Sequence, residues 1–348
     1  MRPPIVSTSQ AILVTTWLVS LIGQVPLSAA WFSVPSINGS KPPSTAKPPS
    51  NVKLLILPGF GNAQEDYFLP QAPEGSLVRS LESRGWESDQ VRVLPVERSD
   101  WINVFTRGAL DRKFWANTAP PTRPAFRWYL DLIAQEMNEA IKEENDRVVL
   151  VGHSAGGWLG RAALGFGSQS DDDSQSTNAD DDKYAVDLDS VLGIVTLGTP
   201  QLPPPPEVMD MTRGALRLTN EQFPNDYHAP NLFYVTVMGQ SVQGEKQERQ
   251  MPWEPTTVKG FAFNSYESVC GDGTVIGDGV VPTCAGHLEG AQQINLPNVL
   301  HSINAPSQWY GSQTILDSWH TSMMERIYRG VDEPSSSFDG FRLPSLLR

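Results

Sequence analysis

A serine stands at the centre of a glycine-flanked pentapeptide, Gly152-His153-Ser154-Ala155-Gly156. The pattern fits G-x-S-x-G, in which the serine occupies a sharp, strained turn between a strand and a helix. Small residues two positions before and after the serine let neighbouring chain segments pass closely. An apolar run at 148–151 precedes the pentapeptide, and a helical pattern extends from it to Leu164. This context predicts that Ser154 is a nucleophile for acyl transfer.

A serine hydroxyl needs a base, held in one tautomer, before it attacks an ester. In proteins that use this turn, the chain order is serine, then an acid, then histidine. Of the histidines after the serine, only His301 lies in a loop just after a late apolar strand, residues 292–296. His287, which precedes that strand, is the alternative base. His228, in a proline-rich loop, and His320, within a helical pattern, are expected at the surface.

The leading candidate for the acid is Asp278, within Gly-Asp-Gly-Val-Val-Pro at 277–282. It precedes the last strand, and its flanking glycines let the backbone turn the carboxylate toward the histidine. Gly-Asp-Gly is also the usual signature of a plain turn, and Asp272 lies in a similar tripeptide. From the residues alone, both interpretations of Asp278 stay open.

Acyl transfer also needs donors for the oxyanion that develops on the ester, and the loss of one such donor costs a hydrolase about 3–4 kcal/mol. One predicted donor is the backbone N–H of Ala155, which follows the serine. The second is expected from the loop after the first strand, Leu-Pro-Gly-Phe-Gly at 57–61, and the backbone N–H of Phe60 is the natural candidate. Neither donor depends on a side chain.

The elements that must position these residues alternate along the chain. Short apolar strands followed by helices favour an α/β fold with a mostly parallel sheet flanked by helices. Helices are expected over 124–145, where apolar residues recur at spacings of three and four, and over 312–328. Strands are expected over 53–57, 91–94, 148–151, 192–197, 232–238 and 292–296.

Composition narrows the classes of partner. The formal net charge of −13 argues against nucleic acid, because phosphate binding needs a basic face. No CxxC spacing occurs, and we predict neither a metal nor a cofactor. The two cysteines, Cys270 and Cys284, are too few for a disulfide scaffold, and a pair and two free thiols both stay open. No obligate protein partner is inferred.

The first 50 residues have the features of a targeting sequence. Residues 1–30 combine an early arginine, an apolar run at 11–22 and small residues at 28–30, which indicates a signal peptide. Residues 31–50 are rich in Ser, Pro and Lys and contain no acid, as in transit peptides. This arrangement resembles the two-part presequence of algae with secondary plastids, so we expect a plastid location, with secretion as the alternative.

The body of the chain is expected to form one domain over 51–330, followed by a tail at 331–348. Within it, residues 168–183 are acidic and polar without an apolar position, and this insertion is predicted to be disordered and solvated. We expect no catalytic role for it.

Nine short motifs together resemble the plastid-targeted α/β-hydrolases of plants and algae. This family is similar in turn to lipases, GPI inositol-deacylases and lecithin–cholesterol acyltransferases. The resemblance covers about residues 52–330 and implies an α/β-hydrolase fold in which Asp278 and His301 complete a triad with Ser154; it implies no particular substrate. In chain order the motifs are LPGFGN (57–62), RSDW (98–101), WYL (128–130), GHSAGGWL (152–159), LGTP (197–200), TRG (212–214), GDGVVP (277–282), HLEGA (287–291) and WYGS (309–312).

These observations predict a serine hydrolase that cleaves carboxylic esters through an acyl-enzyme on Ser154. Segments inserted before the last strands often cap the serine in this fold, so the aromatics between 198 and 271 could line an apolar acyl pocket or simply form core. Trp158 and Trp253 are candidate substrate contacts. A lipid or other hydrophobic ester is the expected substrate, with peripheral contact to a membrane. An acyltransferase of the same mechanism and a non-catalytic ligand-binding relative are the alternatives.

Overall fold

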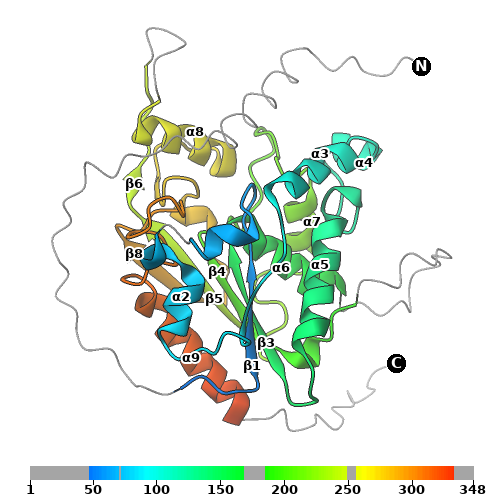
Figure 1. Cartoon of the computed structure of the whole chain (residues 1–348). Helices are drawn as coiled ribbons and strands as arrows, with labels where there is room; N and C mark the ends of the chain where they lie inside the picture. The colour runs from blue at the N-terminus through cyan, green and yellow to red at the C-terminus, as the bar shows by residue number, and fades with distance from the viewer. Residues whose placement is uncertain (1–46, 70–71, 168–184, 249–255, 333–348) are drawn as a thin grey trace, which may run out of the picture.

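A parallel sheet of six strands forms the centre of the molecule (Figure 1). The computed structural model describes residues 47–69, 72–167, 185–248 and 256–332. The strand order is β2-β1-β3-β4-β5-β8. Every strand expected from the sequence is present, with ends that differ by one or two residues: β1 (Val52–Leu57), β2 (Val91–Val93), β3 (Arg147–His153), β4 (Val191–Leu197), β5 (Phe233–Gln240) and β8 (Gln292–Pro297).

Strand β3 lies in the interior of the sheet, between β1 and β4. Gly152, near its end, pairs with Leu57 of β1 and with Thr196 of β4. Because the strands are parallel, the carboxyl ends of all three meet at one edge of the sheet. The segment after β3 therefore emerges beside the loops that follow β1 and β4.

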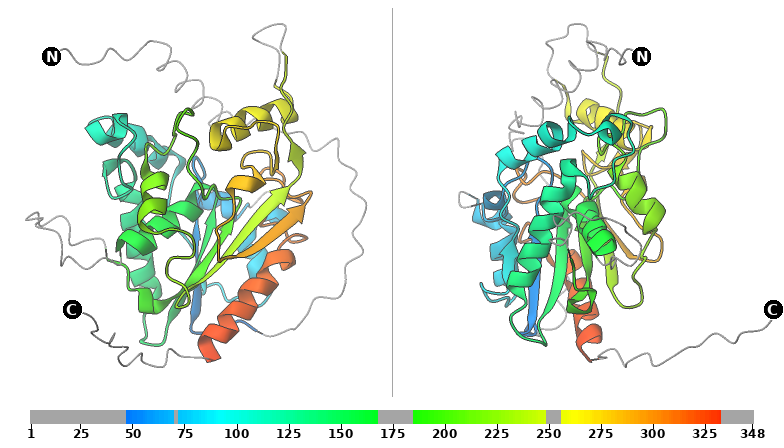
Figure 2. Two further views of the ribbon diagram at one scale, coloured as in Figure 1. Left: turned by 180° about the vertical axis from the view of Figure 1, so that it is seen from behind. Right: turned by 90° about the vertical axis from the view of Figure 1, so that its right-hand side faces the viewer.

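The strands are buried on both faces, which explains their continuous apolar sequences. In β1, Leu55 and Leu57 join one hydrophobic cluster, and Leu54 and Ile56 join the other. Side chains that alternate along a strand point to opposite faces, so each face needs its own cover of helices. The result is the three-layer arrangement visible in Figure 2.

The helices divide between the two faces. The first cluster is closed by α3 (Asn103–Gly108), α4 (Arg112–Trp115), α5 (Pro124–Ala140), α6 (Ala155–Gly167) and α7 (Ala215–Gln222). The second is closed by α2 (Leu77–Glu82) and α9 (Asp317–Asp332). Helix α8 (Val258–Cys270) packs on a short antiparallel pair, β6 (Val242–Gln243) and β7 (Ile276–Gly277), near the carboxyl edge of the sheet (Figure 1).

Two predicted helices end at different residues in the structure. Helix α5 begins as expected, with Pro124 at its first turn, but it ends at Ala140 instead of reaching residue 145. A side-chain cap explains the early end, because Asp146 Oδ2 accepts the backbone N–H groups of Lys142 and Glu143 and holds these residues in a turn. The closing helix is displaced toward the C-terminus, at 317–332 instead of 312–328.

Several predictions fall on residues that the structure does not describe. They are the signal peptide at 1–30, most of the transit-like segment at 31–50, the acidic insertion at 168–183 and the tail beyond residue 332. These predictions stay as they were.

Candidate active site

Ser154 occupies the sharp turn that the pentapeptide predicts. Strand β3 ends at His153, helix α6 begins at Ala155, and Ser154 between them has a φ of 52°. A positive φ is rare for a residue with a side chain and costs about 1–2 kcal/mol. Hydrogen bonds at both backbone groups of Ser154 hold the turn. The Ser154 N–H donates to the Leu197 carbonyl at 2.9 Å, and the Ser154 carbonyl accepts from Thr199 Oγ1 at 2.8 Å and from the Gly157 N–H at 3.1 Å.

The two flanking glycines are required by close packing. A Cβ at Gly152 would lie 2.3 Å from the Gly157 Cα, and one at Gly156 would lie 2.1 Å from the Leu57 carbonyl oxygen. Both contacts are with backbone atoms, which cannot move aside cheaply. The steric reason for small residues at these positions is therefore the one expected from the sequence.

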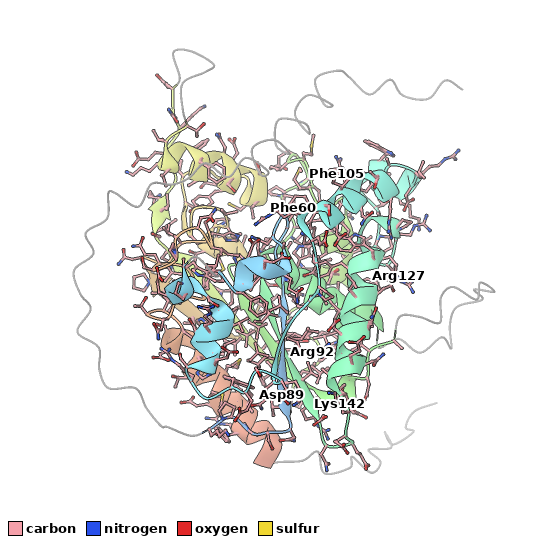
Figure 3. All side chains as sticks on the ribbon, viewed as in Figure 1. Phe60, Asp89, Arg92, Phe105, Arg127 and Lys142 are labelled. Carbon is pink, nitrogen blue, oxygen red and sulfur yellow. The ribbon has the colours of Figure 1, made fainter. Side chains whose placement is uncertain are left out.

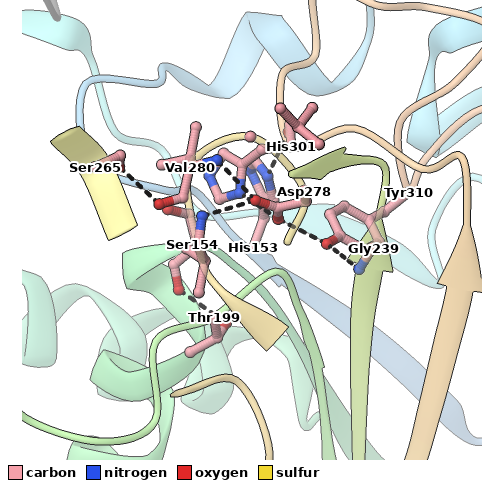
Figure 4. Close-up of polar contacts among 12 residues, drawn as sticks. His153, Ser154, Thr199, Gly239, Ser265, Asp278, Val280, His301 and Tyr310 are labelled. Atoms are coloured by element: carbon pink, nitrogen blue, oxygen red, sulfur yellow. Dashed lines mark hydrogen bonds and ion pairs between the residues drawn. The ribbon is translucent and has the colours of Figure 1, made fainter. Parts of the chain in front are cut away.

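His301 and Asp278 form a buried pair beside this turn (Figure 4). The His301 Nδ1 lies 2.7 Å from Asp278 Oδ2, and the His301 backbone N–H donates to the Asp278 carbonyl at 2.9 Å. Because a carboxylate accepts hydrogen bonds, Nδ1 carries the proton of the neutral ring and donates a hydrogen bond to Asp278. The second ring nitrogen, Nε2, then has a lone pair with which to act as a base. Asp278 is 1 % exposed and His301 is 8 % exposed, so water hardly screens the pair.

Four donors surround the Asp278 carboxylate. Oδ1 accepts the backbone N–H groups of Val280 at 3.0 Å and Val281 at 2.7 Å. Oδ2 accepts from His301 Nδ1 and from the Tyr310 hydroxyl, each at 2.7 Å. Together these donors satisfy the buried carboxylate and fix its orientation toward the imidazole.

The Ser154 hydroxyl lies in the same small region as His301. The rings of His153 and His301 are 4.9 Å apart, and His153 directly precedes the serine. Within the described residues, Ser154 Oγ and His301 Nε2 share no hydrogen bond in this state. Hydrogen bonds at catalytic sites often close only when substrate is present, so proton transfer between these groups belongs to the proposal below.

The predicted oxyanion loop packs against the serine. A Cβ at Gly59 would lie 2.7 Å from the Ser154 Cβ, which places the loop after β1 in contact with the turn. The backbone N–H groups of Phe60 and Ala155 donate no hydrogen bond among the described residues. Both donors are thus available for an oxyanion. The Phe60 ring packs on Trp101 at 5.0 Å, at the end of the molecule where α3 begins (Figure 3).

The competing histidines have other partners. His287 bonds Thr236 Oγ1 at 2.7 Å through Nδ1 and Asn295 Oδ1 at 3.0 Å through Nε2, so both of its nitrogens are occupied. His320 is 7 % exposed and accepts the Trp86 indole N–H at 2.9 Å. The expectation that His320 lies at the surface is therefore wrong, because its position on α9 faces the core.

The remaining candidates also have clear places. The half-buried His228 stacks on Phe223. Asp272 is exposed, and its Oδ1 accepts the N–H and the hydroxyl of Thr274, which makes it the plain turn that Gly-Asp-Gly often forms. Cys270 and Cys284 are free thiols in the structure.

The two tryptophans proposed as substrate contacts have different outcomes. Trp158 is 2 % exposed and packs edge-to-face on Phe126 at 5.2 Å, within the core between α5 and α6. A substrate contact for Trp158 stays a prediction. Trp253 lies outside the described residues. Of the aromatics in the inserted segment, Tyr266 is buried as core, whereas Phe261 is 43 % exposed.

Three buried side chains of the site were not found from the sequence. Tyr310 bonds the Asp278 carboxylate, Tyr67 bonds the Gly59 N–H, and His153 bonds Tyr67. Burial raises the pKa of Tyr67 and, with the charge of Asp278, that of Tyr310, so both hydroxyls stay protonated. Tyr310 lies in the WYGS motif and His153 in the pentapeptide, but nothing in the sequence around Tyr67 indicates its role.

In the part of the chain that the structure describes, no group of three or more His, Cys, Asp or Glu side chains is arranged to hold a metal ion. In the same residues, no helix has the length and apolar content needed to cross a membrane.

The fold and the site together define an α/β-hydrolase, and comparison with known families agrees. The model of the alpha/beta hydrolase family matches residues 54–273, which is more than half of the chain, so the chain belongs to that family. A comparison with curated protein sequences gave no match.

Solved structures that are similar in fold include three bacterial proteins. The mature lipase BlEst2 of Bacillus licheniformis is 13 % identical, covers 82 % of this chain and 95 % of its own, and has a TM-score of 0.44. Lipase 1 from Pelosinus fermentans is 12 % identical, covers 80 % of this chain and 98 % of its own, and has a TM-score of 0.44. EstA from Clostridium botulinum is 13 % identical, covers 84 % of this chain and 92 % of its own, and has a TM-score of 0.42. The likeness is one of fold only.

Proposed function

We propose that this α/β-hydrolase cleaves carboxylic esters through an acyl-enzyme on Ser154. One observation carries the proposal: a serine at φ 52° on the strand-to-helix turn lies beside a buried His301–Asp278 pair. A glycine at position 154, or a different turn, would avoid the strained backbone. The presence of serine there is explained if its hydroxyl is required at this edge of the sheet.

In the proposed reaction His301 Nε2 takes the proton of Ser154 as its Oγ attacks the ester carbonyl carbon. The carbonyl oxygen gains a negative charge and accepts the N–H groups of Phe60 and Ala155. The imidazolium, stabilised by Asp278, then protonates the departing alcohol, which leaves an acyl-enzyme. A water molecule, deprotonated by His301, attacks the acyl carbon, and the proton returns to Ser154 as the acid is released.

The test is hydrolysis of p-nitrophenyl esters, with variants that separate the assigned residues from their competitors. Ser154→Ala and Asp278→Asn should each lower kcat by about 10⁴-fold or more. The first removes the proposed nucleophile, and the second removes the carboxylate that holds His301 in the required tautomer. His301→Asn should be similarly inactive. His287→Asn and Asp272→Asn are the matched controls and should keep most of the activity. Equal rates for wild type and Ser154→Ala would refute the proposal.

We further propose a hydrophobic acyl group in the substrate. Support comes from exposed apolar side chains at the end of the molecule that carries the carboxyl edge of the sheet. Trp115 on α4 is 54 % exposed, Leu110 just before α4 is 90 % exposed, and Phe261 on α8 is 43 % exposed. Helices α3, α4 and α8 lie at this end (Figure 1). Rates that rise from the acetate to longer-chain esters would support this substrate class, whereas activity on acetate alone would exclude it.

We propose a plastid location on the targeting features of residues 1–50. On the same features we propose that the chain belongs to the plastid-targeted branch of the family. A fluorescent reporter fused to residues 1–50 tests this directly in an alga with complex plastids. Fluorescence in the plastid supports the proposal, and export to the medium contradicts it.

A further inference from the structure

His153 and Tyr67 connect two loops of the active site that are far apart in sequence. The Gly59 N–H donates to the Tyr67 hydroxyl oxygen at 3.0 Å, and that oxygen lies 3.0 Å from His153 Nδ1. On the other side of the ring, His153 Nε2 lies 3.2 Å from the His301 carbonyl oxygen. The chain of bonds thus starts in the predicted oxyanion loop and ends on the backbone of the proposed base.

The direction of every bond in this chain follows from the chemistry of its ends. A carbonyl oxygen only accepts, so His153 Nε2 must carry a proton. Burial and, secondarily, the nearby His301 lower the pKa of His153 well below its usual value, so the ring is neutral and Nδ1 has no proton. The Tyr67 hydroxyl must therefore donate to Nδ1, and its oxygen accepts from Gly59.

The network is shielded from water. Tyr67 is fully buried and His153 is 2 % exposed. The Trp309 ring packs on both, 6.1 Å from the Tyr67 ring and 5.6 Å from the His153 ring. In such surroundings an unpaired donor or acceptor costs about 1–3 kcal/mol, so each group holds its partner in place.

We propose that Tyr67 and His153 are a positioning pair that sets the oxyanion loop and the His301 loop relative to each other across Ser154. The inference rests on the proposed function, since it assigns a purpose to the same site. Gly59 directly precedes Phe60, the predicted donor, and His153 directly precedes Ser154. One rigid link therefore fixes the donor, the nucleophile and the base, and the pair touches no reacting atom itself.

Substitutions at His153 can remove the two halves of the link separately. His153→Asn keeps an acceptor near the position of Nδ1, within reach of Tyr67, but cannot reach the His301 carbonyl. His153→Gln places a donor near the position of Nε2 and loses the acceptor for Tyr67. His153→Leu removes both. Tyr67→Phe leaves the Gly59 N–H without a partner.

Each variant is assayed with p-nitrophenyl butyrate and with an alkyl trifluoromethyl ketone, which forms an oxyanion when Ser154 adds to it. We expect Tyr67→Phe and His153→Leu to lower kcat about tenfold to hundredfold with KM changed less than threefold, because a displacement of about 1 Å costs this much. Affinity for the ketone should fall in parallel. His153→Asn and His153→Gln should each recover part of the loss.

A control and a double variant exclude a merely structural role. Tyr234→Phe also removes a buried hydroxyl, which accepts the His228 N–H at 3.4 Å on the other face of the sheet, and should leave kcat and ketone affinity unchanged. All variants are compared below their unfolding midpoints, with the folded fraction measured by circular dichroism. The double variant Tyr67→Phe/His153→Leu should lose little more than the worse single variant.

Two results would overturn the inference in distinguishable ways. If the wild type is active and Tyr67→Phe and His153→Leu both stay within twofold of its kcat and ketone affinity, the positioning pair alone is refuted. A folded wild type that hydrolyses no ester and forms no adduct with the ketone would remove the proposed function and this inference together.

Discussion

Replacing Tyr310 with phenylalanine removes one buried hydroxyl that has two partners. The hydroxyl donates to Asp278 Oδ2 at 2.7 Å and accepts the Gly239 N–H at 2.8 Å. A hydrogen bond to a charged group contributes about 1.5–3 kcal/mol, and a buried unpaired N–H costs about 1–3 kcal/mol. Since the carboxylate keeps three other donors, we expect the free energy of unfolding to fall by about 2–4 kcal/mol.

The same change should alter the pH dependence of activity. Tyr310 and His301 Nδ1 bond the same carboxylate oxygen, so they compete for its electron density. Without the hydroxyl, Oδ2 stabilises the imidazolium more strongly. If half of a bond of about 1.5 kcal/mol is transferred to it, the acidic limb of kcat/KM rises by about half a pH unit. Burial and the charge of Asp278 raise the pKa of Tyr310 well above 10, so the hydroxyl stays a donor throughout this range.

The assay is kcat/KM for p-nitrophenyl butyrate from pH 5 to 9, together with urea unfolding. Tyr266→Phe is the matched control, since its buried hydroxyl accepts the Gly279 N–H at 2.8 Å and donates to the Val242 carbonyl at 3.0 Å. It adjoins the same loop but does not touch the carboxylate. Both variants should lose stability, and only Tyr310→Phe should move the acidic limb. A limb that moves equally in both, or in neither, would refute the reasoning.

Three further perturbations have defined outcomes. Gly198→Ala should lower kcat/KM more than about hundredfold, because the added Cβ would lie 2.6 Å from Asp278 Oδ2 and 3.0 Å from His301 Nδ1, at a φ of 57°. Gly85→Ala is the control: it also places a side chain at a positive φ, 95°, but its Cβ has no contact under 3.4 Å, so it should lower only the stability. Burial lowers the pKa of His320 to about 4, so the neutral ring contributes about 3 kcal/mol to the free energy of unfolding above pH 6.5, and this contribution is lost as the pH falls toward 4. In urea unfolding, the free energy should therefore decline more steeply with falling pH for wild type than for His320→Gln. Burial and, to a smaller extent, the neighbouring Cys284 raise the pKa of Cys270 to about 11. At pH 8 the exposed Cys284 should therefore react with Ellman's reagent before Cys270, and the opposite order in single-cysteine variants would contradict this.

The sheet could be predicted because its strands are buried on both faces. Such strands must be apolar throughout, so runs such as 148–151 are visible without any periodicity. The strand-to-helix turn at Ser154 could be predicted as well, because it requires glycine at 152 and 156, where a side chain would collide with backbone atoms. These constraints act between residues that are close in sequence or repeat along one element.

The residues that hold the site together could not be predicted, because their partners lie far away in the chain. Tyr67 meets His153 across 86 positions, and Tyr310 meets Asp278 across 32. A buried hydroxyl bonded to a backbone amide leaves no local pattern. The end of α5 was predicted too late for a similar reason. The turn after the helix depends on one side-chain cap, from Asp146, and a cap leaves no trace in the helical periodicity of the sequence.

Four buried tyrosine hydroxyls anchor loops of the proposed site. Tyr67 holds Gly59, Tyr129 donates to the Pro58 carbonyl at 2.7 Å, Tyr266 holds Gly279, and Tyr310 holds Gly239 and Asp278. Burial raises the pKa of all four, so none changes charge at working pH. Such bonds gain strength in a dry interior and carry none of the desolvation cost of a buried charge. The Tyr310 hydroxyl therefore holds the Asp278 carboxylate beside His301 without adding a second charge to the proposed site.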